Sequence, residues 1–181
     1  MMDRRNVRRS TANVREMCIF AMLGSLMFAS KILMESLPNI HLVGMLTVTY
    51  TVVYRNRALV PLYIYVMLDG LFGGFSFWWL PYTYIWTLLW GATMLLPKRM
   101  PYKVKVVVYS LICALHGFAF GTLYAPVQAL IFKLNFEQTV AWIIAGLPYD
   151  LIHGLSNLGL GLLIVPLSEL LTKLSYGNKL K

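Results

Sequence analysis

Apolar runs of membrane-spanning length, separated by short basic segments, constrain this chain more than any other feature. Of its 181 residues, 59% are hydrophobic and only 13% are charged. A soluble globular domain is nearer half apolar and about a quarter charged. A helix that crosses the hydrocarbon core needs about 20 mainly apolar residues. The pattern therefore predicts an all-α integral membrane protein with a single membrane domain.

The placement of the basic residues predicts the orientation in the membrane. Four clusters hold all but two of the 16 Lys and Arg residues: an N-terminal arm, the 55–57 loop, the 98–105 loop and the tail from residue 173. With six spans and a cytoplasmic N-terminus, all four lie inside, and only Lys31 and Lys133 lie towards the outer side. This is the positive-inside pattern. It explains the net charge of +9 without nucleic acid as a partner, and it leaves membrane lipid as the surroundings.

We expect a cytoplasmic basic arm at 1–16, partly disordered, a six-span domain at 17–172 and a cytoplasmic tail at 173–181. The spans are expected near residues 17–34, 38–54, 58–77, 82–96, 104–124 and 149–171. The second is short and rich in threonine, so neighbouring helices should shield it. Pro126 is expected to end the fifth span and Pro148 to open the sixth, with an outer connection between them. Pro166 is expected to kink the sixth span near the inner face.

A stripe of small and polar residues follows Pro148. Asp150, His153, Gly154, Asn157 and Gly161 recur at helical spacing and share one face. Leucines and isoleucine cover the rest of the helix. We predict that the stripe faces something other than lipid. Asp150, so close to the proline, either contacts a ligand or caps the helix start.

Polar residues at membrane depth are costly and therefore candidates for function. Here they are Asp69, His116, Asp150, His153 and Asn157. This set is compatible with hydrogen bonding within the fold, with a metal at His116, Asp150 and His153, or with a polar organic ligand between the helices. Aromatic walls with a few convergent polar groups favour the ligand. Lys31 and Glu35, four residues apart, are interpreted as a pair that neutralises itself at the interface. We expect no cofactor and no resident metal.

Several functions lack the motifs that they require. The chain contains no HExxH or GxSxG motif and no Walker A loop. Cys18 and Cys113 are isolated in apolar segments, which gives no disulfide framework. No cleavable signal is apparent. We therefore expect a protein that is not an enzyme and does not itself bind ATP through a Walker A loop.

The chain resembles the substrate-binding S components of energy-coupling factor (ECF) transporters. The layout is similar, with about 180 residues and six expected spans. Ala21, Ser25 and Ala29 form a small-residue stripe on the first span, and residues 148–157 are similar to a Pro-x-Asp-x-x-His-x-x-x-Asn pattern in many members. The resemblance covers the whole chain in layout but only some 30 residues in motif.

The resemblance implies a subunit of the bacterial cytoplasmic membrane that captures a vitamin-like ligand from outside. It implies partners, namely a coupling membrane subunit and two ABC-type ATPases, with Ala21, Ser25 and Ala29 docking the coupling subunit. It implies that the loop of Asn39 and His41 closes the site. Candidate ligand contacts in the outer halves of the later spans are Asp69, Trp79, Trp86, His116, Gln128, His153 and Asn157.

Two readings compete with capture. One is a stand-alone secondary transporter that uses Asp69, His116 and Asp150. The other is a membrane enzyme or metal site at His116, Asp150 and His153. The identity of the ligand stays open among thiamine-like, flavin-like, nucleobase-like and cobalamin-related molecules. Aromatic walls suit a flat heterocycle, and Asp69 or Asp150 suits a cationic or amide-bearing group.

Overall fold

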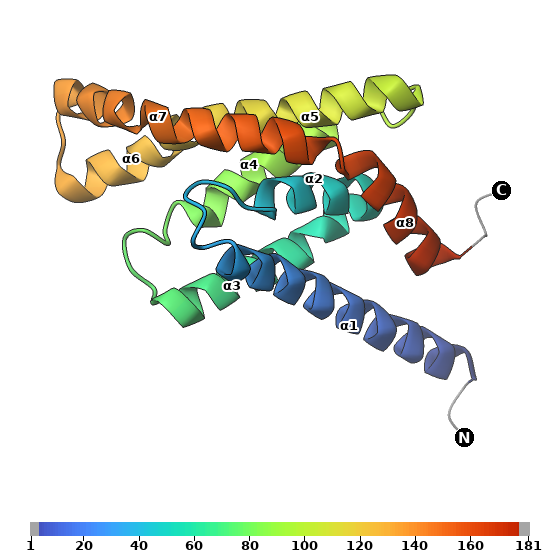
Figure 1. Ribbon diagram of the computed structural model, residues 1–181. Helices are drawn as coiled ribbons and strands as arrows, with labels where there is room; N and C mark the ends of the chain where they lie inside the picture. Colours follow the sequence, from blue (N-terminus) through green and yellow to red (C-terminus); the bar gives the residue numbers. More distant parts are fainter. Residues whose placement is uncertain (1–3, 178–181) are drawn as a thin grey trace.

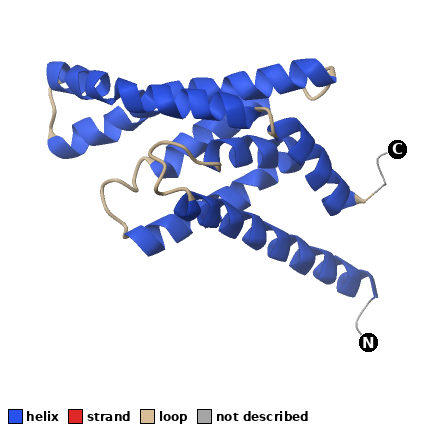
Figure 2. Cartoon of the chain, in the orientation of Figure 1, coloured by secondary structure: helices blue, strands red, loops and turns tan. Residues whose placement is uncertain are grey.

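The computed structural model describes residues 4–177, and every regular element within them is helical (Figure 2). The prediction of an all-helical chain is confirmed. The elements, in chain order, are α1 (Arg4–Leu33), α2 (Val43–Tyr54), the short 3-10 helix η1 (Arg55–Ala58), α3 (Leu59–Gly73), α4 (Tyr82–Leu95), α5 (Tyr102–Phe118), α6 (Phe120–Phe132), α7 (Phe136–Gly161) and α8 (Ile164–Tyr176).

Two helical stretches in residues 4–177 are long and apolar enough to cross a membrane by themselves. They are Val14–Leu33 in α1 and Tyr102–Phe132, which joins α5 and α6. A third arises if α7 and α8, bent by 52° at their junction, count as one span. Helices α2, α3 and α4 have 12, 15 and 14 residues, fewer than the roughly 20 that a full crossing takes. Membrane association follows from these helices, while the number six stays a prediction.

Helix α2 is short and lies at the centre of the molecule. Ten of its 12 residues are buried, as expected for a helix that is apolar all round. Two of its three threonines are satisfied within the helix, since the hydroxyls of Thr49 and Thr51 donate to the carbonyls of Met45 and Thr47. The expectation that neighbouring helices shield this segment is confirmed.

The helix ends gather at two opposite sides of the molecule (Figure 1). The end of α1, the α3–α4 loop and the α6–α7 turn lie on one side. The start of α1, the end of α8 and the α4–α5 loop lie on the other. Contacts tie the second side together, because Arg57 pairs with Glu16 and the Tyr54 hydroxyl lies 2.6 Å from that of Ser175.

The expected break at Pro148 is wrong. Helix α7 begins at Phe136, where Asn135 and Gln138 form a capping box, and continues through Pro148 to Gly161. A proline inside a helix removes one backbone hydrogen bond, which a long membrane helix tolerates. The segment expected to dip back towards Pro148 is thus the first half of α7.

Of the other two proline predictions, the one for Pro126 is wrong, and the kink of the last helix from Pro166 is confirmed. Pro126 does not end the fifth span, since it lies inside α6. The interruption lies earlier, at Ala119 between α5 and α6. The bend expected at Pro166 occurs at 162–163, just before it. Pro166 has no N–H for the carbonyl of Leu162 and its ring crowds that carbonyl, so the helix breaks one turn upstream.

The basic arm also differs from expectation. Helix α1 starts at Arg4, so residues 4–16 continue the first membrane helix instead of forming an irregular segment. At the other end, α8 extends through Lys173 to Tyr176. Residues 1–3 and 178–181 of the expected arm and tail lie outside the described residues.

Candidate ligand cavity

The polar stripe of α7 faces the protein interior, as its spacing predicts. The buried residues of α7 are Asp150, His153, Gly154, Asn157 and Gly161. The stripe packs mainly against α5. A Cβ added to Gly117 would lie 2.9 Å from the backbone of Gly154, and one added to Gly161 would lie 2.6 Å from Cα of Ser110. Most of the stripe is therefore a close-packed seam between two antiparallel helices.

Asp150 stabilises the chain where α5 ends and α6 begins. Both of its carboxylate oxygens accept from the backbone N–H of Gly121, at 3.0 and 3.1 Å. Gly121 is the second residue of α6, where a backbone N–H has no partner within its own helix. Asp150 does cap a helix start, but that of α6 and not that of its own helix.

Asn157 and His116 also bond to backbone groups. Asn157 Nδ2 donates to the carbonyl of Cys113 at 3.3 Å, and His116 Nε2 lies 3.1 Å from the carbonyl oxygen of Ile85. Both side chains are buried. Of the three residues considered for a metal, His116 and Asp150 are thus engaged by separate backbone groups. No group of three His, Cys, Asp or Glu residues with metal-binding geometry occurs in the described part of the chain.

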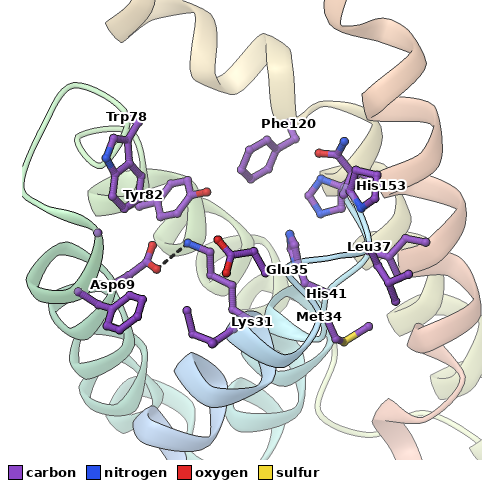
Figure 3. A pocket seen from close by; sticks show the side chains of 16 residues that line it. Lys31, Met34, Glu35, Leu37, His41, Asp69, Trp78, Tyr82, Phe120 and His153 are labelled. Atoms are coloured by element: carbon purple, nitrogen blue, oxygen red, sulfur yellow. Dashed lines mark hydrogen bonds and ion pairs between the residues drawn. The ribbon is translucent and has the colours of Figure 1, made fainter.

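A cavity of about 500 Å³ opens where α1 ends (Figure 3). The end of α1, the following loop, the end of α3 and the starts of α4 and α6 surround it, and His153 of α7 completes it. Its polar lining consists of Lys31, Glu35, Asn39, His41, Asp69 and His153. Its aromatic lining consists of Phe72, Trp78, Tyr82 and Phe120.

An ion pair between α1 and α3 dominates the charge of this cavity. Lys31 Nζ lies 2.5 Å from Asp69 Oδ1. The ammonium also lies 5.2 Å from the ring centroids of Trp78 and Tyr82. The predicted pairing of Lys31 with Glu35 is therefore wrong, because Asp69 is buried and needs a counter-charge more than the exposed Glu35 does. The other oxygen of Asp69, Oδ2, is buried without a hydrogen-bond partner among the described residues.

Two histidines form a second polar edge of the cavity. The rings of His41 and His153 lie 4.7 Å apart, and Phe120 lies 4.8 Å from His153. Within the described structure, His41 Nδ1 and His153 Nε2 are buried without hydrogen-bond partners. Burial and the charge of Lys31 lower the pKa of His41, in the loop between α1 and α2, to about 4. His41 is thus neutral at pH 7 and presents a free ring nitrogen.

The structure brings four of the predicted residues to the cavity: Asn39, His41, Asp69 and His153. The remaining predicted contacts, which do not line it, are Trp79, Trp86, His116, Gln128 and Asn157. Trp79 donates its indole N–H to the carbonyl of Val66 at 2.7 Å. Trp86 is buried behind His41, with ring centroids 5.8 Å apart. Gln128 is half-buried on α6.

Sequence reasoning missed Lys31, Trp78, Tyr82 and Phe120 as cavity residues. Lys31 was predicted to pair with Glu35, and Trp78, Tyr82 and Phe120 were not among the candidate contacts. One signal was available for the ion pair. Lys31 and Asp69 are opposite charges near the expected outer ends of the first and third spans, and buried charges need partners.

The small-residue stripe of α1 points away from the core. Ala21, Ser25 and Ala29 are all exposed. The adjacent Gly24 is the residue that packs within the chain, since a Cβ added to it would lie 2.6 Å from the Ile64 side chain of α3. The stripe is thus available to lipid or to a partner.

Comparisons of the chain with models of protein families, with curated proteins and with solved structures find no match. The basis for assigning a function is therefore the cavity itself. It combines a part-buried ion pair, two histidines and an aromatic wall in one open cavity. These are groups that bind a small polar molecule, and no arrangement of a nucleophile with a base is present among them.

Proposed function

We propose that this chain is the substrate-capture membrane subunit of an ECF-type importer and binds a small vitamin-like ligand, heterocyclic in character, in the Lys31–Asp69 cavity. The observation that carries the proposal is the cavity, in which an ion pair and unpartnered polar atoms meet an aromatic wall. Its volume of about 500 Å³ falls in the range of small-molecule sites, about 300–1,000 Å³.

The proposed topology has six membrane segments with both termini in the cytoplasm. It is supported by the way in which the helix ends alternate between the two sides of the molecule (Figure 1). The basic 55–57 and 98–105 segments lie on the side of the α1 start and the α8 end, which the positive-inside rule makes cytoplasmic. The cavity lies at the opposite side and therefore opens outwards.

The proposed partners are a coupling membrane subunit and two ABC-type ATPases. The chain has no Walker A loop of its own, so active uptake needs an energy source elsewhere. The exposed stripe of Ala21, Ser25 and Ala29 offers a flat surface on which a partner helix packs closely. A stand-alone carrier using Asp69, His116 and Asp150 is less favoured, because His116 and Asp150 are held by backbone groups.

Binding and uptake measured with the same panel of vitamins and vitamin precursors test the proposal. The purified chain should bind one class saturably without partners. Uptake of that ligand into liposomes should require the coupling subunit and the ATPases. Absence of saturable binding across the panel would contradict capture, and uptake by the chain alone would favour the stand-alone carrier.

The docking surface has its own control within α1. Ser25→Leu should leave ligand binding unchanged and abolish partner-dependent uptake, because Ser25 is exposed. Gly24→Leu should instead disrupt the fold, since its side chain would collide with Ile64. Equal loss of binding and uptake in Ser25→Leu would contradict a docking role.

A further inference from the structure

The Lys31 ammonium occupies a cage suited to a cation. The Asp69 carboxylate lies on one side at 2.5 Å, and the rings of Trp78 and Tyr82 lie at 5.2 Å (Figure 3). Aromatic faces attract cations, and a nearby carboxylate adds to that attraction. The same combination of rings and carboxylate recognises organic cations that come from solution. Here it holds a cation belonging to the chain.

The cage has unused capacity for a cation. The Asp69 side chain is only 4% exposed, and its Oδ2 has no hydrogen-bond partner in the part of the chain that the structure describes. Among the charged residues that line the cavity, Asp69 and Glu35 are acidic and only Lys31 is basic. The lining is therefore net negative with the histidines neutral, and it complements a positive ligand.

Lys31 is free to leave the cage. Its side chain is long and 26% exposed, and it lies in the last turn of α1 beside the open cavity. Glu35 lies two residues beyond the end of α1 and lines the same cavity. Figure 3 draws its carboxylate on the Lys31 side of the cavity. A displaced ammonium therefore has a second partner nearby.

We propose that the ligand carries a cationic nitrogen group, an amine or a quaternary or heteroaromatic nitrogen, that displaces the Lys31 ammonium from the cage of Asp69, Trp78 and Tyr82. The inference rests on the proposed capture function and specifies the class of ligand. Lys31 moves to Glu35 as the ligand enters, so Asp69 keeps a counter-charge in both states. The Asp69 carboxylate is therefore never buried without a counter-charge, a state that would be costly.

The reactivity of Lys31 towards an acylating reagent tests this displacement in the wild-type chain. The probes are choline, its neutral isostere 3,3-dimethylbutan-1-ol, and acetate. Mass spectrometry of peptides after brief acylation in detergent gives the rate at Lys31, with the exposed Lys133 as the internal reference. We expect choline to raise the Lys31 rate saturably, by about threefold or more, because the ammonium moves from a part-buried to an exposed position. The neutral alcohol should change neither rate.

A second variant keeps the test independent of the wild-type affinity for choline. In Asp69→Asn, the acylation of Lys31 should be fast without any probe, and choline should not change its rate. The elution profile on size exclusion checks that the variant is folded. Equal effects of choline and the neutral alcohol, or no effect of choline at any concentration, would overturn the inference. So would slower acylation of Lys31 in acetate, which would make this an anion site. In each of these cases, saturable binding of a vitamin from the panel would leave the capture function standing.

Discussion

At the scale of single residues, the buried polar groups divide into two sets. Asp150, Asn157 and His116 bond to backbone groups of neighbouring helices. Asp69 and His153 are distinguished by lining the cavity; each keeps a buried polar atom without a partner among the described residues, as His116 and Asn157 also do away from the cavity. The first set maintains the fold, and the second is available to a ligand.

The two halves of the Lys31–Asp69 pair should differ in their importance for stability. Lys31→Met leaves the Asp69 charge buried and unpaired, and should lower the free energy of unfolding by about 3–5 kcal/mol. Asp69→Asn should cost less, about 1–3 kcal/mol, because the Lys31 side chain is 26% exposed and turns to solvent or to Glu35. Thermal unfolding in detergent measures the order of the two. A less stable Asp69→Asn would contradict it.

Asp150 should matter for stability and not for ligand binding. Asp150→Ala leaves the buried N–H of Gly121 without an acceptor, at a cost of about 1–3 kcal/mol. Asp150→Asn keeps one acceptor oxygen and should cost less. The ligand found with the panel should bind both folded variants with wild-type affinity. Loss of binding in a stable Asp150→Asn protein would contradict this and indicate that Asp150 contacts the ligand.

At the scale of elements, the α5–α7 seam was largely predictable from the sequence. The helical period of α7 gave the buried face correctly, because the burial of a helix stripe follows from its spacing alone. The partner of that stripe was not predictable. It depends on which helix lies opposite, and Gly117 and Ser110 of α5 supply that surface. The break at Pro148 was mispredicted because the capping box at Asn135 starts the helix earlier.

Three glycine substitutions test the seam with a matched control. Gly117→Ala places a methyl group 2.9 Å from the backbone of Gly154, and overpacking of this kind costs about 1–3 kcal/mol. Gly159→Ala, on the same helix as Gly154, meets nothing within 4 Å and should stabilise by up to about 1 kcal/mol. Gly154→Ala should destabilise to a similar extent as Gly117→Ala, since the added methyl group would collide with the Phe118 ring. Thermal unfolding of the three variants checks this order, and equal effects would contradict a close-packed seam.

At the scale of the whole molecule, the all-helical class and the alternation of helix ends follow from apolar runs and turn positions in the sequence. The cavity does not, because it is made by side chains from α1, α3, α4, α6 and α7 and by the loop after α1. A sequence shows that Asp69 needs a partner but not that α3 lies against α1. Only Asn39, His41, Asp69 and His153 of the predicted contacts reach the cavity for this reason.

Single cysteines in a variant lacking Cys18 and Cys113 test the topology. A membrane-impermeant maleimide added to intact cells should label Ser76→Cys and Glu137→Cys, which lie at the side of the α3–α4 loop and the α6–α7 turn. It should label Asn56→Cys and Arg99→Cys only after permeabilisation. All four positions are exposed, so differences report sidedness and not burial. Labelling of Arg99→Cys in intact cells would contradict the proposed orientation.

The most direct test of the central claim is native mass spectrometry of the purified chain with two adjacent tryptophan variants. Met34 lines the cavity, whereas Leu33 is 82% exposed and does not line it. The wild type and Leu33→Trp should each carry one small molecule per chain, and Met34→Trp, which places a bulky ring in the cavity lining, should carry less. Undiminished retention of the molecule by a folded Met34→Trp protein, or its absence from the wild type after exposure to the vitamin panel, would contradict ligand capture in this cavity.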